Sequence, residues 1–229
     1  SDMLMSACSD SPGPLTMQPI RATLRSSTPG YFHFHVGISS RLPLMSHGVN
    51  LNPFYAENDR RSDSKIPPLQ MFATTDGGYF RAMGTPLLAG RTFEGTETQR
   101  EYEAVISRLT AETFWQTPEN AVGKRFRPLP SGPWYTVIGV VESMRDTALA
   151  APQTAAVYYP QAFPADTSMN QLAGTMALVV RTDGTDAASV IPSLQRVVRD
   201  LDPSLPTFDA QPMQTVVNRS MARYLVSGS

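Results

Sequence analysis

The stretch GYFRAMGTPLLAGRTF, residues Gly78–Phe93, joins aromatic and aliphatic residues to three glycines and one proline. It predicts a short helix over Tyr79–Met83 that ends at Gly84, because glycine readily adopts the left-handed backbone found at helix C-termini. Pro86 prevents the helix from continuing, since proline lacks a backbone N–H. A helix this short is marginal on its own. We therefore expect four apolar side chains to anchor the turn in the core: Phe80, Leu87, Leu88 and Phe93.

Strand signals lie on both sides of this stretch. From Tyr31 to Ile38 apolar and polar residues alternate, which is the pattern of a strand with one buried face. Between residues 41 and 68, prolines and polar residues predict a loop with short extended pieces. Further strands are expected at short apolar runs, namely Leu69–Thr74, Ala104–Ile106, Trp134–Val141, Ala155–Tyr159 and Met176–Arg181.

Helix signals are found mainly in the second half of the chain. Ser107 is a suitable N-cap for a helix that continues to about Trp115. An apolar stripe over Val190–Leu201 predicts a second helix, which either starts near Pro192 or bends there. Pro212 suits the first turn of a last, amphipathic helix. Strands mixed with helices, without strict alternation, indicate an α+β fold.

Composition excludes several classes of protein. A chain of 229 residues is one large domain or two small lobes. Its 19 basic and 20 acidic side chains leave a net charge of −1, which argues against binding to nucleic acid. A single cysteine excludes a disulfide framework and a multi-cysteine zinc site. No apolar run approaches the roughly 20 residues that a membrane span needs.

Motifs for catalysis or nucleotide binding do not emerge from the sequence. Gly123-Lys124 resembles the end of a phosphate-binding loop, but Arg125 replaces the hydroxyl residue of that motif and Pro118 replaces its first glycine. Without these residues the backbone amides cannot wrap a phosphate. We therefore expect no nucleotide site, no cofactor and no catalytic residues.

Two groups of carboxylates lie beside predicted strands. Glu101 and Glu103 flank Tyr102 at the start of a strand, which is more typical of a solubilising edge than of an acid/base pair. Residues 142–146 follow a buried strand, where an active site or a simple polar loop would fit equally well.

His33 and His35 have a spacing that suits metal binding. Two residues apart on a strand, their side chains share a face about 7 Å apart. They could bind zinc or copper if a third ligand came from elsewhere. The alternative, which we favour, places both on the solvated face of an amphipathic strand. No metal site is therefore expected, and His33 and His35 stay as the candidates.

The stretch Gly78–Phe93, called the opening stretch below, closely resembles the YFRxMGxPLLxGRxF segment of MacB-like periplasmic core domains. Such domains occur in FtsX/MacB-type ABC transporter permeases. Each further segment is weak alone, but together they keep the family's order, and this makes the resemblance specific. It covers roughly Leu69–Tyr224 and is strongest to acidobacterial-type duplicated permeases without a fused ATPase. The further segments are Ala104–Ser107, Val122–Phe126, Tyr135–Val141, Val157–Pro160, Leu178–Thr182 and Leu201–Pro206.

The resemblance implies a two-lobed periplasmic domain. A discontinuous porter-like lobe would comprise residues 14–101 and 172–226, and a sabre-like lobe, residues 102–171, would be inserted between them. Residues 1–13 and 227–229 would be linkers or artificial ends. The two chain ends would both lead into one membrane, so residues near Pro14 and Tyr224 should emerge on the same side of the fold.

The resemblance also implies a function. Such a domain lies on the periplasmic side of the bacterial cytoplasmic membrane and is non-catalytic. It would couple ATP hydrolysis to periplasmic conformational change, for efflux or signalling. The implied partners are the permease's own transmembrane helices, a separate cytoplasmic ABC ATPase subunit, and a periplasmic adaptor or substrate protein; no nucleic acid is expected.

Two other functions stay open on the sequence alone. One is a secreted metal-binding protein or hydrolase that uses His33 and His35. The other is a periplasmic module that binds a lipid or a peptide between its lobes.

Overall fold

The structure, a computed structural model, describes residues 2–8, 34–45, 50–59, 67–93, 102–145, 152–161, 175–182, 186–201, 203 and 207–227. Within these residues one mixed sheet contains twelve strands: β1 (Asp2–Cys8), β2 (Phe34–Ser39), β3 (Leu51–Pro53), β4 (Tyr55–Ala56), β5 (Leu69–Thr75), β6 (Leu87–Gly90), β7 (Glu103–Ser107), β8 (Arg125–Arg127), β9 (Tyr135–Val141), β10 (Ala156–Pro160), β11 (Thr175–Thr182) and β12 (Thr207–Pro212). The helices are α2 (Tyr79–Met83), α3 (Arg108–Trp115), α4 (Pro118–Ala121), α5 (Ala187–Leu201) and α6 (Met213–Ser227).

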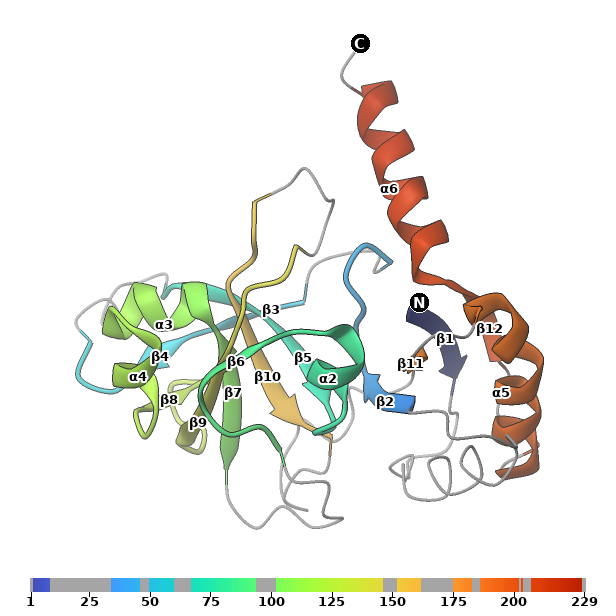
Figure 1. The fold of residues 1–229 in the computed structure, drawn as a ribbon. Helices are drawn as coiled ribbons and strands as arrows, with labels where there is room; N and C mark the ends of the chain where they lie inside the picture. Colours follow the sequence, from blue (N-terminus) through green and yellow to red (C-terminus); the bar gives the residue numbers. More distant parts are fainter. Residues whose placement is uncertain are drawn as a thin grey trace.

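The sheet runs from β12 at one edge to β4 at the other, in the order β12-β1-β11-β2-β5-β10-β7-β9-β8-β4. Strand β3 pairs with β5, and β6 pairs with β9. Pairs β5–β10 and β7–β9 are parallel, and the other pairs are antiparallel. This mixture of parallel and antiparallel strands with few helices confirms the predicted α+β class. Figure 1 shows α5 at the β12 side and α3 and α4 at the β4 side.

The sheet has a narrow join between β2 and β5. Among the described residues these strands pair at one position, Ser39 opposite Thr75. Next to it, the Ser40 N–H donates to the Thr74 carbonyl at 2.8 Å, and the Thr74 N–H donates to Ser40 Oγ at 2.9 Å. The Asp76 carboxylate accepts from the Ile38 N–H at 3.0 Å. The join therefore consists of a few hydrogen bonds at the strand ends rather than a long ladder.

The predicted lobe boundaries stay a prediction. Residues 101 and 171, which precede the proposed cuts, lie outside the described residues. Pro14 and the residues of the proposed N-terminal linker beyond Cys8 lie outside them as well.

Apolar side chains form three buried clusters in the described residues. One lies between α5 and strands β2 and β11, with Leu194 of α5 fully buried at its centre. A second, rich in aromatic rings, lies under α3 and α4 and includes Phe54, Phe126 and Tyr159. The third spans the narrow join, and we call it the bridging cluster: Leu42, Met71, Ala73, Tyr79, Phe80, Ala82, Phe93, Val105, Ile138, Val141, Ala156, Tyr158, Ala177, Val179 and Val216.

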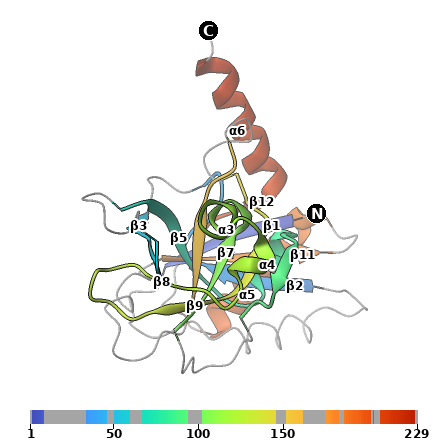
Figure 2. The ribbon, with the colours of Figure 1, turned by 90° about the vertical axis from the view of Figure 1, so that its left-hand side faces the viewer.

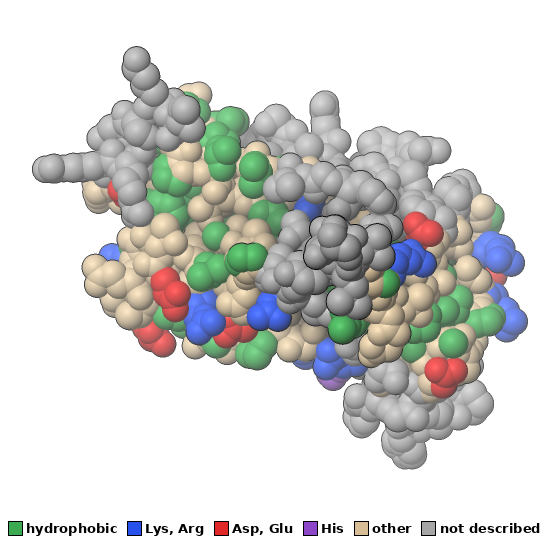
Figure 3. Space-filling view, turned by 90° about the horizontal axis from the view of Figure 1, so that it is seen from above, with side chains coloured by type: hydrophobic (Ala, Val, Ile, Leu, Met, Phe, Trp, Pro, Cys, Tyr) green, Lys and Arg blue, Asp and Glu red, His purple; other side chains and the backbone are tan. Residues whose placement is uncertain are grey.

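Helix α6 leaves the body of the molecule. It begins at Met213, directly after β12 ends at Pro212, so no loop separates strand and helix. Val216 in its first turn is buried, whereas Met221 is 52% exposed. Figures 1 and 2 show the rest of the helix rising away from the sheet. Seen from the side on which α6 ends, basic and acidic side chains are interspersed over the described surface (Figure 3).

Most predicted elements are confirmed where the structure describes them. Helix α2 covers the predicted residues, and Gly84 has the expected left-handed backbone, with φ 67°. Ser107 caps α3, whose bounds match the predicted helix. The predicted strand over Tyr31–Ile38 is observed from Phe34 onward as β2, and its first three residues lie outside the described residues.

The predicted anchoring of the opening stretch is partly wrong. Phe80 and Phe93 are buried as expected, but Leu87 and Leu88 are 44% and 36% exposed. The register of β6 against β9 shifts between Leu87 and Ala89, which leaves Leu88 as an extra residue on the edge strand. Such a bulge interrupts the alternation of side chains, so both leucines point away from the core.

Pro192 does not mark the start of its helix. Helix α5 begins earlier, at Ala187, and Pro192 lies inside it. The carbonyl that its missing N–H would have bonded belongs to Ala188, which is exposed. Water can therefore satisfy that group, and the usual cost of an internal proline is reduced.

Candidate functional site

The structure describes one of the two candidate metal-binding histidines, His35. His33 lies outside them. His35 is half-buried on β2, directly opposite Arg181 of β11. Within the described ranges, no three His, Cys, Asp or Glu side chains gather closely enough to hold a metal ion. A cationic neighbour gives no support for a metal ion at His35.

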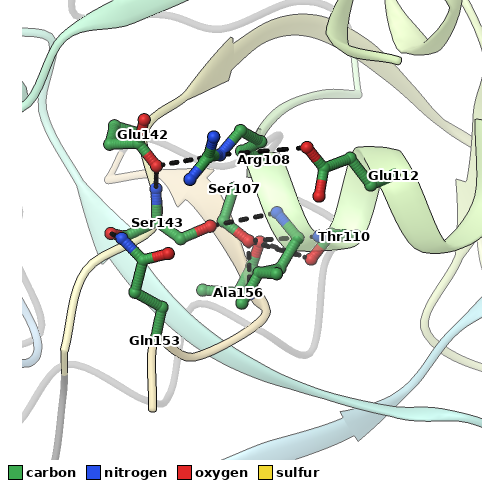
Figure 4. Close-up of polar contacts among 9 residues, drawn as sticks. Ser107, Arg108, Thr110, Glu112, Glu142, Ser143, Gln153 and Ala156 are labelled. Carbon is green, nitrogen blue, oxygen red and sulfur yellow. Dashed lines mark hydrogen bonds and ion pairs between the residues drawn. The ribbon is translucent and has the colours of Figure 1, made fainter. Parts of the chain in front are cut away.

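Residues 142–145, the described part of the predicted polar loop, contact the start of α3. The Ser143 hydroxyl accepts a hydrogen bond from the Leu109 N–H at 3.0 Å, and Arg108 Nε lies 3.0 Å from Glu142 Oε1 (Figure 4). The loop therefore joins the carboxyl end of β9 to the N-terminus of α3.

This place resembles a ligand site by position. It lies where the parallel strands β7 and β9 end and a helix begins, which is where open α/β sheets often bind ligands. Here the N–H groups of Leu109 and Thr110, which such a ligand would use, donate instead to the hydroxyls of Ser143 and Ser107. The arrangement fits a structural contact better than an anion site.

A buried polar chain continues inward from the same helix start. Ser107 Oγ accepts from the Ala156 N–H at 2.9 Å. The Thr110 hydroxyl lies 2.8 Å from Gln70 Oε1 and 3.2 Å from the Ala156 carbonyl oxygen. These contacts tie α3 to β5, β7 and β10, and Figure 4 shows how Ser107, Thr110 and Ala156 converge. Buried groups that are fully hydrogen-bonded in this way make the strand ends rigid.

Glu103 corrects one sequence prediction. It was expected at a solubilising strand edge, but it is buried on β7, between β10 and β9 in the sheet. Its carboxylate pairs with the Arg91 guanidinium at 2.5 Å. Arg91 belongs to the opening stretch, so this pair fastens the end of that stretch to the central strands. Glu101 lies outside the described residues.

The bridging cluster contains residues from both sides of the narrow β2–β5 join. Val216 enters it from α6, and Ala177 and Val179 enter it from β11 on the same side of the join. Tyr79 and Phe80 of α2 belong to it as well. Beyond the join, it continues through β5, β10, β7 and β9, with Val105 of β7 and Ile138 of β9 among its members. The first turn of α6 is thus packed into the same core as strands β5, β10, β7 and β9.

Helix α2 is held at the centre of this cluster by β2 and β11. A Cβ on Gly37 of β2 would lie 2.3 Å from the Tyr79 backbone, so helix and strand are in direct backbone contact. Arg181 Nε of β11 donates to the Ala82 carbonyl at 3.0 Å, at the C-terminus of α2. A cation there is favourable for the helix dipole as well as for the hydrogen bond.

The start of β1 and the root of α6 lie side by side. Met3 is opposite Pro212 in the antiparallel β1–β12 pair, and α6 begins at the next residue. Figure 1 shows the beginning of β1 beside the base of α6. A chain that arrives through β1 and departs through α6 therefore does so from one end of the molecule.

A comparison with protein-family models identifies the family of the chain. The model described as the MacB-like periplasmic core domain matches residues 26–197, which is more than half of the sequence. The chain belongs to the MacB-like periplasmic core domain family, as the resemblance implied. It is thus the periplasmic domain of a MacB/FtsX-like ABC transporter permease family. None of the helices in the described residues is long and apolar enough to cross a membrane.

Two solved structures with TM-scores above 0.5 show the same fold. The periplasmic region of MacB from Actinobacillus actinomycetemcomitans matches with a TM-score of 0.54 and 16% identity, over 94% of this chain and 91% of that chain. A domain assigned to a permease protein from Porphyromonas gingivalis matches with a TM-score of 0.51 and 16% identity, over 92% and 89%. The extracellular domain of the ABC-type transporter YknZ from Gram-positive bacteria gives 0.49 and 16%, over 91% and 100%. A comparison with curated proteins finds no match.

Sequence reasoning missed the residues that connect the parts. Arg181 could have been noticed as a cation at the end of an otherwise apolar strand, but its partner Ala82 is distant in sequence. Val216 carried the signal of an amphipathic helix, which indicates a buried face without saying what covers it.

Proposed function

We propose that this chain is a non-catalytic coupling domain of its permease. In this proposal, transmembrane segments attached next to β1 and after α6 move when a separate cytoplasmic ABC ATPase subunit hydrolyses ATP. The domain transmits that movement to the periplasm, where it serves efflux or signalling through an adaptor or a substrate protein. The division into porter-like residues 14–101 and 172–226 and sabre-like residues 102–171 is part of the same proposal.

The bridging cluster is the observation that supports this mechanism. Val216 of α6 and Val105 of β7 lie in one packed core, although the backbone join between the two sides of the sheet is narrow. Packed cores resist continuous deformation. A displaced α6 would therefore move α2 and the far strands with it rather than bend the sheet at the join.

The adjacent positions of Met3 and Pro212 support the attachment to a membrane. If both ends lead into it, they deliver force to neighbouring strands β1 and β12 at the same end of the molecule. The described length of α6 corresponds to about 22 Å at 1.5 Å per residue. It is long enough to act as a lever on the sheet.

The proposal is tested in the full permease with its ATPase. Spin labels are placed at Glu119→Cys on α4 and Arg219→Cys on α6, both exposed sites. The one cysteine of this chain is first replaced by Cys8→Ser, and any cysteines elsewhere in the permease are replaced as well. We expect the label-to-label distance to differ between the ATP-bound and nucleotide-free states. Val216→Ala should reduce this difference while ATP hydrolysis continues, because it removes the packing of α6 in the bridging cluster.

Met221→Ala is the matched control, since Met221 lies on the same helix but is 52% exposed. It should preserve the nucleotide-dependent change. A distance that is the same in every nucleotide state would refute coupling, as would an undiminished change in the Val216→Ala variant.

A further inference from the structure

The edge of the sheet opposite α6 carries an unusual set of side chains. Phe126 of β8 is buried in the aromatic cluster, so its neighbours Arg125 and Arg127 point to the other face of the strand. Tyr55 of β4 lies directly opposite Arg127. Trp134, just before β9, completes the set. This part of the molecule faces the viewer in Figure 2.

One of the two arginines has an acidic partner. Arg125 Nε donates to Glu57 Oε2 at 3.0 Å, and Arg125 Nη2 contacts Glu57 Oε1. The hydrogen bond from Arg125 holds the pKa of Glu57 below its usual value, and the same bond raises the pKa of Arg125. Arg125 is therefore engaged within the domain.

Arg127 is held differently. Its guanidinium carbon lies 4.8 Å from the centre of the Trp134 ring, and that of Arg125 lies 5.7 Å from it. In the part of the chain that the structure describes, no carboxylate pairs with Arg127, and its buried Nε has no hydrogen-bond partner. The Arg127 cation therefore lies over an aromatic ring, and none of the ion pairs among the described residues includes it.

We propose that Tyr55, Arg127 and Trp134 form a docking surface for an acidic segment of a partner protein. Tyrosine, tryptophan and arginine are the residues that most often dominate binding energy at protein interfaces. A guanidinium stacked on an aromatic ring presents its donors as a planar fork, which suits a carboxylate. Leu129, 49% exposed in the same hairpin, adds apolar area beside the surface.

The local charge of this surface indicates that the partner segment is negatively charged. Among the described residues of this edge, Glu57 pairs with Arg125 and attracts Lys124. No ion pair among the described residues includes Arg127, so basic side chains are in excess there. The whole chain has a net charge of −1, which does not suit the long anionic surface of a nucleic acid or a bilayer. A short segment with one or two carboxylates matches a cation confined to one edge.

The role of this docking surface rests on the proposed coupling function. Strand β12, which leads into α6, and strand β4 lie at opposite edges of the sheet. If the membrane segments move α6 and the sheet moves with it as one body, a partner bound to this surface would move as well.

Binding is tested on the chain itself by NMR. The sequence contains two tryptophans, so the indole N–H signals of Trp134 and Trp115 are easily assigned. Trp115 packs on Phe54 beneath β4 and serves as an internal reference. We expect a short peptide of alternating glutamate and valine to shift the Trp134 signal saturably, more weakly at high salt, and to leave Trp115 unmoved.

Arg127→Gln should weaken binding by about tenfold, which corresponds to the loss of one charge-assisted hydrogen bond. Arg127→Lys should lose affinity as well, because it keeps the charge but not the planar fork. Arg196→Gln, at an exposed site on α5, is the matched control and should bind as the unmodified chain does. Unchanged melting temperatures and Trp115 signals show that the variants are folded.

Several results would overturn the proposal: no Trp134 shift, an equal shift with a lysine–valine peptide, or unchanged affinity in Arg127→Gln. A shift caused by phosphatidylglycerol vesicles but not by the glutamate peptide would assign the surface to lipid instead. The experiment does not involve α6 or the ATPase, so its failure is distinct from a failure of the coupling proposal.

Discussion

Gly84 shows how one residue can satisfy two requirements that only glycine meets. Its φ of 67° lies in the left-handed region, which costs other L-residues energy. A Cβ at this position would also lie 2.4 Å from Arg181 Nη2, the guanidinium that caps α2. The first requirement ends the helix, and the second lets β11 approach it.

Gly84→Ala should therefore destabilise the domain more than a backbone effect alone. The left-handed conformation costs alanine about 1–2 kcal/mol, and displacing the Arg181 hydrogen bond to Ala82 adds about 1 kcal/mol. Gly123→Ala is the control, because Gly123 also has positive φ, 81°, but nothing lies within 4 Å of its would-be Cβ. Urea unfolding measures both; equal losses would show that Arg181 does not depend on the absence of a side chain at position 84.

Single residues were predictable from sequence where the cause is local. The backbone of Gly84 follows from a short helix and a proline two residues later. The pairing of Glu103 with Arg91 does not, because a carboxylate in sequence looks the same whether it faces water or an arginine brought close by folding. The predicted solubilising role of Glu103 failed for that reason.

At the scale of elements, α3 illustrates how a helix start can be fastened to several strands. Its N-cap, Ser107, is also the last residue of β7, and its hydroxyl accepts hydrogen bonds from Thr110 and from Ala156 of β10. The sequence predicted the cap, since serine before a helix is a strong signal. It could not predict the contact with β10, which depends on strand order.

Ser107→Ala should cost more than the loss of an ordinary cap. The missing cap costs about 1 kcal/mol, and leaving the buried Ala156 N–H without an acceptor costs about 1–3 kcal/mol more. Thr117→Ala removes the equivalent cap from the exposed helix α4 and should cost about 1 kcal/mol or less. Thermal or urea unfolding measures the stability of both variants. A loss of unfolding free energy for Ser107→Ala no larger than for Thr117→Ala would contradict the proposed double role of Ser107.

Strand β6 marks the limit of pattern reasoning for elements. Two consecutive leucines followed by alanine and glycine suggest a core segment, and that was the prediction. The bulge at Leu88 turns the pair outward, and nothing in the local sequence reports the register of an edge strand against its partner. Bulges belong to the pairing of two strands and are invisible in either one alone.

At the scale of the whole molecule, the mixture of strand and helix signals predicted the α+β class, while the connection between the two sides of the sheet came only from the structure. Most of the segments that carry the resemblance contain strands or strand ends, for example Val157–Pro160 and Leu178–Thr182. Their mutual packing in the bridging cluster depends on which strands become neighbours. Val216, which lies in none of those segments, is what brings α6 into that core.

If the bridging cluster is one cooperative unit, a change at its α6 end should be felt at its centre. Val216→Ala removes two methyl groups from a buried site and should cost about 1–3 kcal/mol. Hydrogen exchange should then accelerate at the Ala82 amide of α2, which donates to the Gly78 carbonyl. The Phe126 amide lies in the separate aromatic cluster, so its exchange rate should rise less than that of the Ala82 amide.

Met221→Ala provides the comparison on the same helix, and it should leave both amides as they are because Met221 is mostly exposed. Acceleration confined to α6 in Val216→Ala would mean that the helix frays from the sheet without loosening α2. In that case α6 could not transmit movement through the cluster, since an element that detaches freely passes no force to its neighbours. Acceleration at Ala82 would instead show that the root of α6 and the helix of the opening stretch open together.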